Sequence, residues 1–135
     1  MTTDTTATRT FVSPDGLTKS PAFNHAVIKD GRPVYIAGQL PIGPDGAVVG
    51  IGDIDAQCTQ VWSQIRAVVE AAGGTMADLV KITTYITEID HVAAVLASRV
   101  QQFAPGEVPA SALLVVKSLA RAEFLVEIEA VALIA

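Results

Sequence analysis

Residues 53–74 read DIDAQCTQVWSQIRAVVEAAGG, and this segment has the clearest periodicity in the chain. Apolar side chains recur three or four positions apart, as they do on one face of an α-helix. They are Ile54, Cys58, Val61, Trp62, Ile65, Val68, Val69 and Ala72. Asp53 or Asp55 can cap the first turn, and Gly73-Gly74 offers the left-handed exit on which helices commonly end. The pattern predicts a long helix with one buried face.

Two short apolar runs precede this helix, at residues 26–28 and 34–37. They flank Asp30-Gly31, and an Asp-Gly pair between apolar runs is a strong turn signal. We therefore predict a β-hairpin here. Residues 47–49 are a brief further strand candidate.

After the helix, residues 80–87 are rich in β-branched side chains, which favours a strand. Asp90 then caps a predicted second helix, which ends at Pro105-Gly106. Its apolar line is Val92, Leu96, Val100 and Phe103. Two more strands are predicted at 112–117 and 124–133, and alternation in the second places Glu127 and Glu129 on one face.

This order of elements predicts an α/β (α+β) fold in which two helices cover one face of a mixed β-sheet. The length of 135 residues corresponds to one domain, which we place at 11–135 after a flexible tail at 1–10. Mean hydropathy is +0.45 with only 17% charged residues. We expect some apolar surface to remain after folding and an oligomer to cover it.

Composition also limits the partners and cofactors. A net charge of −5 without any run of Lys or Arg argues against nucleic acid. The apolar runs 112–116 and 130–135 are too short to cross a bilayer, so no membrane partner is expected. The single cysteine, Cys58, excludes an intramolecular disulfide and a Cys-cluster zinc site, and it suits the cytoplasm. Without a phosphate-loop, serine-elbow or paired-His motif, we expect no cofactor and no metal.

A few side chains remain candidates for chemistry. Glu127 and Glu129 form a carboxylate pair that can hold a proton or a water molecule, although most such pairs face solvent. His25, at the start of a predicted strand, is a weaker candidate. Cys58 is interpreted as a buried structural thiol and His91 as an exposed polar residue after the helix cap.

An ordered set of short segments resembles the reactive intermediate/imine deaminase family, RidA/YjgF. Ala37-Gly38-Gln39-Leu40-Pro41 is similar to the family's Ser-Gly-Gln-Ile-Pro. Similar segments follow in the family's order over about residues 14–134. They are Ala71-Ala72-Gly73-Gly74, Val80-Lys81-Ile82-Thr83-Thr84, Pro109-Ala110 and Leu125-Val126-Glu127-Ile128-Glu129-Ala130.

The resemblance implies a chorismate-mutase-like fold and a homotrimer whose sheets pack around a central barrel. Small-molecule ligands are implied to bind in three clefts between neighbouring subunits. The implied reaction is cofactor-independent hydrolysis of enamines or imines, such as 2-aminoacrylate, to a 2-keto acid and ammonia. Glu127 corresponds to the glutamate that positions the attacking water, and Gly38 to a glycine whose backbone approaches the ligand.

The remaining implied binding positions depart from the family pattern. Ala37 stands in place of a serine and Phe23 in place of a tyrosine. Ser111 stands in place of the arginine that binds the substrate carboxylate, and Leu113 in place of a small or thiol-bearing residue. Loss of a bidentate anchor removes about 1.5–3 kcal/mol per charged hydrogen bond.

These changes make the implied cleft more apolar, so we expect a neutral or weakly acidic carbonyl, imine or enamine ligand. Lys117, six positions after Ser111, is a minor candidate for a substitute cation, whereas Arg121 lies in a turn. The leading interpretation is a RidA-like enzyme with altered substrate and doubtful 2-aminoacrylate deaminase activity. The alternative is a non-catalytic trimer that binds a metabolite or regulates a partner.

Overall fold

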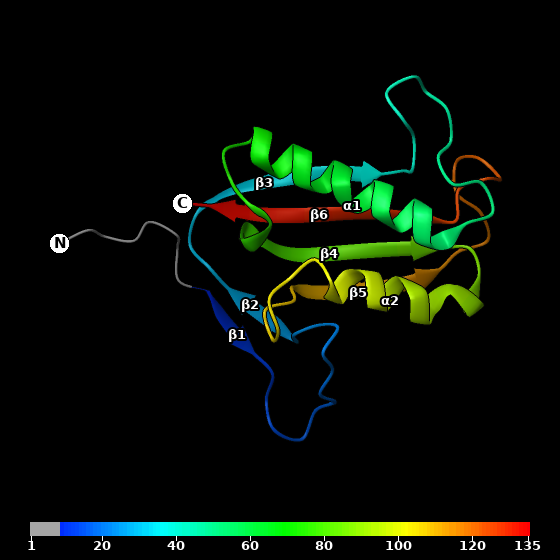
Figure 1. Cartoon of the computed structure of the whole chain (residues 1–135). Coiled ribbons are helices and arrows are strands. Elements are labelled where there is room, and N and C mark those ends of the chain that lie inside the picture. Colours follow the sequence, from blue (N-terminus) through cyan, green and yellow to red (C-terminus); the bar gives the residue numbers. More distant parts are fainter. Residues whose placement is uncertain (1–8) are drawn as a thin grey trace.

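The computed structural model describes residues 9–135, which form a four-stranded sheet, a two-stranded sheet and two α-helices (Figure 1). The strands are β1 (Thr10–Val12), β2 (Ala26–Ile28), β3 (Arg32–Gln39), β4 (Leu79–Ile86), β5 (Ala110–Val115) and β6 (Val126–Ile134). The helices are α1 (Ile54–Ala71) and α2 (Val92–Val100), and short 3₁₀ turns occupy Met76–Asp78 and Ile89–His91.

The larger sheet has the order β3-β6-β4-β5 and is mixed. Strand β6 pairs antiparallel with both β3 and β4, and β5 pairs parallel with β4 at the edge. Parallel neighbours need a crossover connection, and α2 provides it. The long hydrophobic β6, with a partner on either side, is therefore the centre of the fold.

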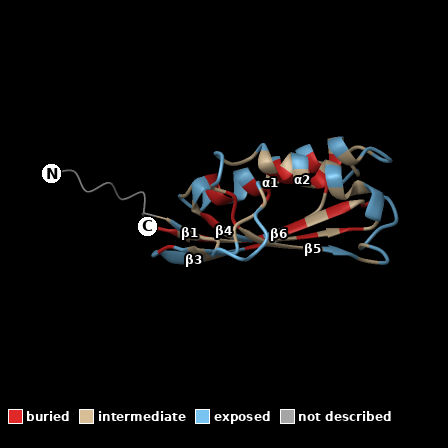
Figure 2. Ribbon diagram, turned by 90° about the horizontal axis from the view of Figure 1, so that it is seen from below, coloured by how far each residue is buried: buried red, intermediate tan, exposed pale blue. Residues whose placement is uncertain are grey.

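Both helices cover one face of this sheet, and the buried residues lie between the two layers (Figure 2). The inward side of α1 contributes Val61, Trp62, Ile65 and Val69 to the core. Alternate residues of β6 beginning at Val126 meet them from the sheet. The predicted α+β fold, with two helices backing a mixed sheet, is confirmed.

The long helix forms as its sequence predicts. Asp53 is the N-cap, and its side chain accepts a hydrogen bond from the Ala56 backbone N–H at 3.0 Å. Gly73 follows the helix with φ +96°, a left-handed conformation in which glycine is favoured. Of the two capping candidates, Asp53 performs this role.

The predicted β-hairpin is wrong. Strand β2 pairs with β1, while β3 pairs with β6 along most of its length. Gly31 has φ +148°, and a Cβ there would lie within 2.8–2.9 Å of the Ile134 backbone. The Asp-Gly turn thus passes the chain from the small sheet to the large one, because β6 offers β3 a longer partner than β2 does.

Other boundaries differ modestly. The helix expected as far as Phe103 ends at Val100, and its fully buried side chains are Val95 and Arg99. Val48 forms only an isolated bridge with Ile42. The tail predicted at 1–10 lies mostly outside the described residues, and its last residue, Thr10, begins β1.

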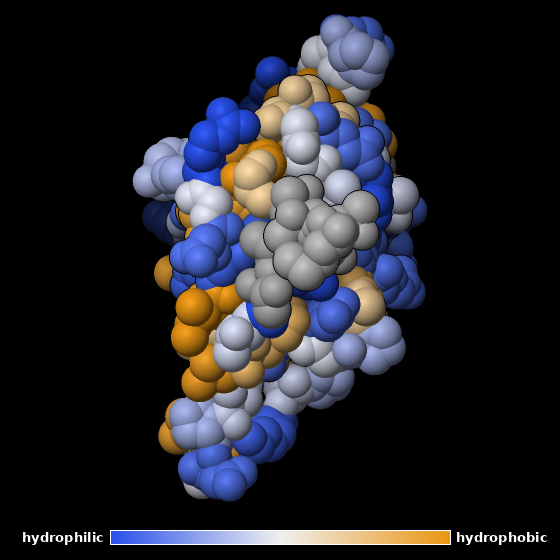
Figure 3. All heavy atoms as spheres, turned by 90° about the vertical axis from the view of Figure 1, so that its left-hand side faces the viewer, coloured by the Kyte–Doolittle hydropathy of each residue, from blue (hydrophilic) through white to orange (hydrophobic). Residues whose placement is uncertain are grey.

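The second face of the large sheet carries no helix (Figure 2). Tyr35 is 78% exposed and Leu114 is 44% exposed, and both belong to strands of this sheet. Seen from the end where β6 finishes, apolar surface gathers mainly along one side of the molecule (Figure 3). The uncovered face therefore mixes apolar with polar side chains. We call it the open face.

Candidate functional site

Glu127 lies near the start of β6 and projects from the open face, opposite the neighbouring core residues Val126 and Ile128. Its carboxylate lies against the backbone of Gly38 on β3. A Cβ atom at position 38 would overlap Glu127 Oε2 and lie 2.9 Å from its Cδ. A side chain at position 38 would therefore displace the end of the Glu127 side chain. The structure thus brings Glu127 and Gly38 together within one chain.

Two glutamine side chains on α1 hold this part of the sheet in place. Gln57 is fully buried, and its Nε2 donates to the carbonyls of Glu123 at 2.8 Å and Gly50 at 3.2 Å. Its Oε1 accepts from the Leu125 backbone N–H at 2.8 Å, two residues before Glu127. Gln57 thus fixes where β6 begins.

Gln64 acts similarly on β3. Its Nε2 donates to Gln39 Oε1 at 3.1 Å and to the Leu40 carbonyl at 2.9 Å, next to Gly38. The sequence analysis did not identify Gln57 or Gln64. A signal existed for Gln57, because it precedes Val61 by four positions and so lies on the apolar face of α1.

The electrostatics of the open face favour a proton on Glu127. Burial, followed by repulsion from the Glu129 carboxylate, raises the pKa of Glu127 above its ordinary value. Tyr85 on β4 donates its hydroxyl to Glu129 Oε1 at 2.9 Å, and this bond raises the pKa of Tyr85. Glu129 also lines a hollow on this face with Tyr35, Lys81 and Thr83. The predicted carboxylate pair therefore shares one face.

A second cluster surrounds Ser111 on the edge strand β5. Its hydroxyl accepts a hydrogen bond from Nη1 of Arg99 at 2.8 Å. Arg99 comes from the last turn of α2 and is 2% exposed. The same Nη1 donates to the Ala22 carbonyl at 3.2 Å, and Nη2 donates to Thr84 Oγ1 at 3.3 Å. A buried cation that is not predicted from the sequence therefore contacts Ser111, the position at which a family arginine was expected to be replaced.

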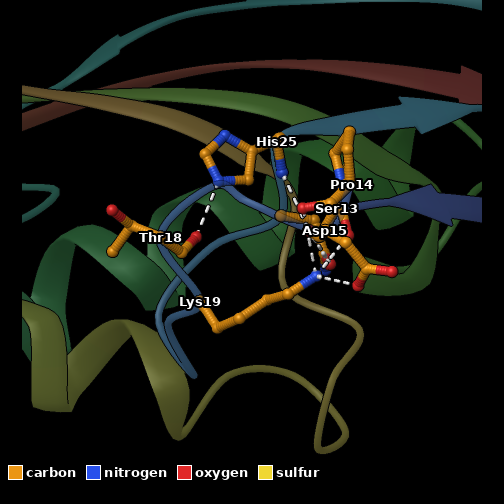
Figure 4. A network of polar contacts seen from close by, with 7 residues as sticks. Ser13, Pro14, Asp15, Thr18, Lys19 and His25 are labelled. Atoms are coloured by element: carbon orange, nitrogen blue, oxygen red, sulfur yellow. Dashed lines mark hydrogen bonds and ion pairs between the residues drawn. The ribbon is translucent and has the colours of Figure 1, made fainter.

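Phe23 lies beside this cluster. Residues 22–24 run along the start of β5, where Asn24 forms a parallel bridge with Ala110. The Phe23 ring packs edge-on against His25 at a centroid separation of 5.2 Å. His25 Nε2 lies 2.7 Å from the Thr18 carbonyl and must donate to it, so its ring is turned toward the loop that also holds Lys19 (Figure 4).

The remaining predicted site residues lie apart from one another. Leu113 packs against the core under the helices, and Ala37 is exposed on β3. Lys117 is exposed and lies beyond the end of β5, so it does not share a strand face with Ser111. Arg121 is exposed and stacks over the Phe124 ring at 5.5 Å.

Within one chain the two clusters are separate. Register pairs Ser111 with Ile82 and Ile82 with Ala130, three positions along β6 from Glu127. Ser111 bonds to a helix-layer side chain, whereas Glu127 projects from the open face. We call them the Ser111–Arg99 cluster and the Glu127–Gly38 cluster.

His91, expected to be exposed, is instead partly buried, and its Nδ1 has no hydrogen-bond partner among the described residues. Cys58 is buried, and burial raises the pKa of its thiol to about 11, so it is protonated at neutral pH. Among residues 9–135 no group of three or more His, Cys, Asp or Glu side chains is placed to hold a metal ion. In the same part of the chain no helix combines the length and apolar character needed to cross a membrane.

Comparison with known proteins agrees with this architecture. The family model described as Endoribonuclease L-PSP matches residues 16–134. A RutC family protein of Pyrococcus horikoshii is 36% identical over 105 residues, which cover 78% of this chain and 82% of that protein. The corresponding protein of Pyrococcus abyssi is 33% identical over the same length, covering 78% and 81%.

Solved structures of the same kind superpose well. A protein of unknown function of the conserved Rid family from Yersinia pestis has a TM-score of 0.83 and 34% identity, covering 93% of this chain and 98% of that one. RidA from an Antarctic Psychrobacter has a TM-score of 0.71 and 31% identity, covering 90% and 94%. The fold thus defines a small α+β protein of the Rid type. The chain belongs to the RidA/YjgF family.

Proposed function

We propose that this protein is a cytoplasmic, cofactor-independent enzyme that hydrolyses a small reactive imine or enamine, or a related carbonyl intermediate. Glu127 is the catalytic residue that handles the proton and the attacking water. The ligand lies in a cleft between subunits of a homotrimer, lined by Phe23, Ala37, Gly38, Ser111 and Leu113.

The observation that carries this proposal is the Glu127–Gly38 cluster. The Glu127 carboxylate occupies the space that a Cβ at position 38 would take, and its pKa is raised by burial and by Glu129. A carboxyl group works best as an acid and base when its pKa moves toward the working pH. Its placement by Gln57 and Gln64 gives it the fixed geometry that catalysis needs.

The reaction balances without any other reactant. An enamine takes a proton from solvent at carbon and becomes an iminium ion, the protonated form of the imine. Ionised Glu127 accepts one proton from water while the water oxygen bonds to the iminium carbon, which gives a neutral aminoalcohol. Glu127 then returns its proton to the nitrogen, the C–N bond breaks as the C=O bond forms, and the hydroxyl proton leaves to solvent, which replaces the proton taken up at the start. One imine and one water give one carbonyl product and one ammonia.

The trimer is supported by the separation of the two clusters and by the uncovered open face. Tyr35 is 78% exposed at the middle of β3, which a neighbouring subunit would cover. We expect Tyr35→Asp to convert the trimer to monomers in light scattering after size exclusion. Ile89→Asp is the matched control, because Ile89 is 67% exposed but lies in a 3₁₀ turn outside the sheet. A wild-type monomer would contradict the proposal.

The direct test supplies 2-aminoacrylate from a dehydratase and follows ammonia release with and without the protein. The same assay is then repeated with imines of other amino acids as substrates. We expect acceleration for at least one imine, with Glu127→Gln reducing it at least 100-fold. Glu123→Gln, an exposed carboxylate just before β6, is the control and should keep full activity. Equal rates for the wild type and Glu127→Gln would refute a catalytic Glu127.

A second candidate is a silent trimer that binds a metabolite or a partner enzyme. It is favoured by Ser111, Ala37 and Phe23, which replace three polar anchors of the family pattern. In that case no imine is hydrolysed, and Glu127→Gln leaves ligand affinity unchanged.

The matched family model is named for endoribonuclease activity. A net charge of −5 makes RNA a poor ligand for this chain, and an RNA cleavage assay tests that directly.

A further inference from the structure

Tyr85 lies on the open face, directly across the sheet from Glu127. Strand register pairs the two residues between β4 and β6. Their strand neighbours Ile86 and Val126 are fully buried in the core, so the side chains of Tyr85 and Glu127 project from the opposite face. Directly opposite side chains of an antiparallel pair have Cβ atoms about 4.5–5.5 Å apart. Tyr85 is therefore a cross-strand neighbour of the residue that carries the proposed reaction.

The two side chains approach β6 from opposite sides. The Glu127 carboxylate turns toward β3, where it occupies the space that a Cβ of Gly38 would fill. Tyr85 comes from β4, on the other side of β6, and donates its hydroxyl to Glu129 Oε1 at 2.9 Å. A ligand lying over this part of β6 would thus have a carboxylate on one side and a phenol on the other.

The hydroxyl of Tyr85 can take part in a proton transfer without a change of charge. Its proton is directed at Glu129, and its oxygen can still accept a hydrogen bond from another group. The bond to Glu129, followed by burial, raises the pKa of Tyr85, so the phenol keeps its proton at neutral pH. Its oxygen can therefore take up a new proton only as the old one passes to Glu129.

We propose that Tyr85 is a second catalytic residue, which passes the hydroxyl proton of the aminoalcohol to Glu129. This inference rests on the proposed function, in which Glu127 handles the other proton of the attacking water. As the C–N bond breaks and the C=O bond forms, the hydroxyl of the aminoalcohol becomes a much stronger acid. The Tyr85 oxygen accepts its proton while the phenol proton moves to Glu129. One O–H bond of Tyr85 forms as the other breaks, so the phenol is unchanged and Glu129 holds the proton.

Glu129 is placed to release this proton to water. Its side chain is exposed and lines a hollow of about 220 Å³ on the open face, together with Lys81 and Thr83. A water molecule takes up about 30 Å³ in the liquid, so the hollow has room for several. The proton that leaves here balances the one that the enamine takes from solvent. The two carboxylates of the open face then divide the two protons of the attacking water between them.

The test measures ammonia release by Tyr85→Phe with 2-aminoacrylate and with the imine of leucine as substrates. At a pH where Glu127 is fully ionised, we expect kcat to fall on the order of tenfold to a hundredfold, with KM unchanged, because water replaces a positioned acid–base group only in part. Glu129→Gln should lower kcat by a similar factor. The double variant should lose no more than either single variant, because both residues serve one transfer.

The solvent isotope effect gives a readout that a purely structural role of Tyr85 would not move. In mixtures of H₂O and D₂O, kcat of wild type should fall along a curve as the deuterium fraction rises, because two protons move in one step. In Tyr85→Phe this dependence should become nearly linear. A linear dependence in wild type would contradict the transfer through Tyr85.

Tyr35→Phe is the matched control, since it removes a phenol hydroxyl from the same face but on β3. It should keep the wild-type kcat. Three results would overturn the inference and leave the proposed function standing: full kcat in Tyr85→Phe, a change confined to KM or to the acid side of the pH profile, or a double variant whose loss is the product of the single losses. No imine hydrolysis by wild type, or equal rates for wild type and Glu127→Gln, would overturn both.

Discussion

The two clusters of the candidate cleft are built in different ways. In the Glu127–Gly38 cluster a carboxylate lies against a strand backbone, and Gln57 and Gln64 hold the strand ends around it. In the Ser111–Arg99 cluster a buried arginine of helix α2 donates to a serine of the edge strand. One cluster is positioned by many hydrogen bonds to backbone groups, whereas the other depends on a single buried charge.

This difference indicates what each cluster contributes. Backbone clamps fix a reacting group in one place, which suits a residue that must meet water and substrate in a set geometry. A buried cation with neutral partners costs stability, because no counter-charge repays its desolvation. Substitutions in the first cluster should therefore harm stability or catalysis. Replacing the cation of the second cluster should cost little stability.

The largest effect on stability is expected for Gln57→Ala. This change leaves two backbone groups without partners, the Glu123 carbonyl and the Leu125 N–H, whereas the Gly50 carbonyl keeps the Asp53 N–H at 2.8 Å. Each buried unsatisfied group costs about 1–3 kcal/mol, so we expect a loss of about 2–3 kcal/mol in urea unfolding once water enters part of the space. Ser63→Ala on the exposed side of α1 is the control. A loss of unfolding free energy below about 1 kcal/mol would contradict the role of Gln57 in holding these backbone groups.

Gly38→Ala should have a small effect on stability and a severe effect on activity. The new methyl group overlaps the end of the Glu127 side chain, which is flexible and can turn away. We expect unfolding in urea to report a loss of about 1 kcal/mol or less, and imine hydrolysis to fall at least tenfold because the carboxylate leaves its position. Gly46→Ala is the control for activity: it has open space around it and leaves Glu127 untouched, so activity should persist, although its φ of +83° strains any side chain and should itself lower stability.

The sequence predicts the scaffold better than the sites. Periodicity locates α1 and its Asp53 cap, and alternation locates Glu127 on the outer side of β6, because these signals are local. The Asp30-Gly31 turn was misinterpreted because nothing local shows that β3 will pair with the distant β6. Pairing between remote strands is a property of the folded chain.

Arg99 was missed although a signal was present. It follows Val95 by four positions, so it lies on the buried face of α2, where a cation is unusual. Reading the helix as Val92, Leu96, Val100 and Phe103 hid this. The partner Ser111 lies twelve residues later on another element, and only the packing of α2 over β5 brings the two side chains together.

Arg99→Met tests the second cluster with an effect on stability expected to be small. Removing the buried charge recovers its desolvation cost, but it also leaves the Ala22 carbonyl and the Ser111 and Thr84 hydroxyls without their donor. We expect the two contributions to cancel in large part, so that urea unfolding shows a change within about 1 kcal/mol of wild type. A loss above about 3 kcal/mol would make Arg99 a structural residue and erase the contrast between the clusters.

The smallest effect on stability is expected for Glu129→Gln, which removes one negative charge beside the Glu127–Gly38 cluster. Glu129 repels the Glu127 carboxylate, and this repulsion adds to burial in raising the pKa of Glu127. Because the raised pKa belongs to an acid, the folded state holds the proton more tightly than the unfolded chain. Its stability therefore falls as pH rises through that pKa. Removing the Glu129 charge should lower the pKa of Glu127 part of the way, since burial remains.

Titration of the Glu127 side chain by carbon NMR checks this directly. The rate of imine hydrolysis should fall on the acid side of its pH profile, because ionised Glu127 is the base. In Glu129→Gln this fall should move to lower pH by the same amount as the pKa of Glu127. Stability at neutral pH should rise by only a few tenths of a kcal/mol, as expected for partly exposed charges. Glu123→Gln should shift neither. If this fall in rate stays at the same pH while the pKa of Glu127 falls, another group must be the base, and the Glu127–Gly38 cluster would serve only to shape the cleft.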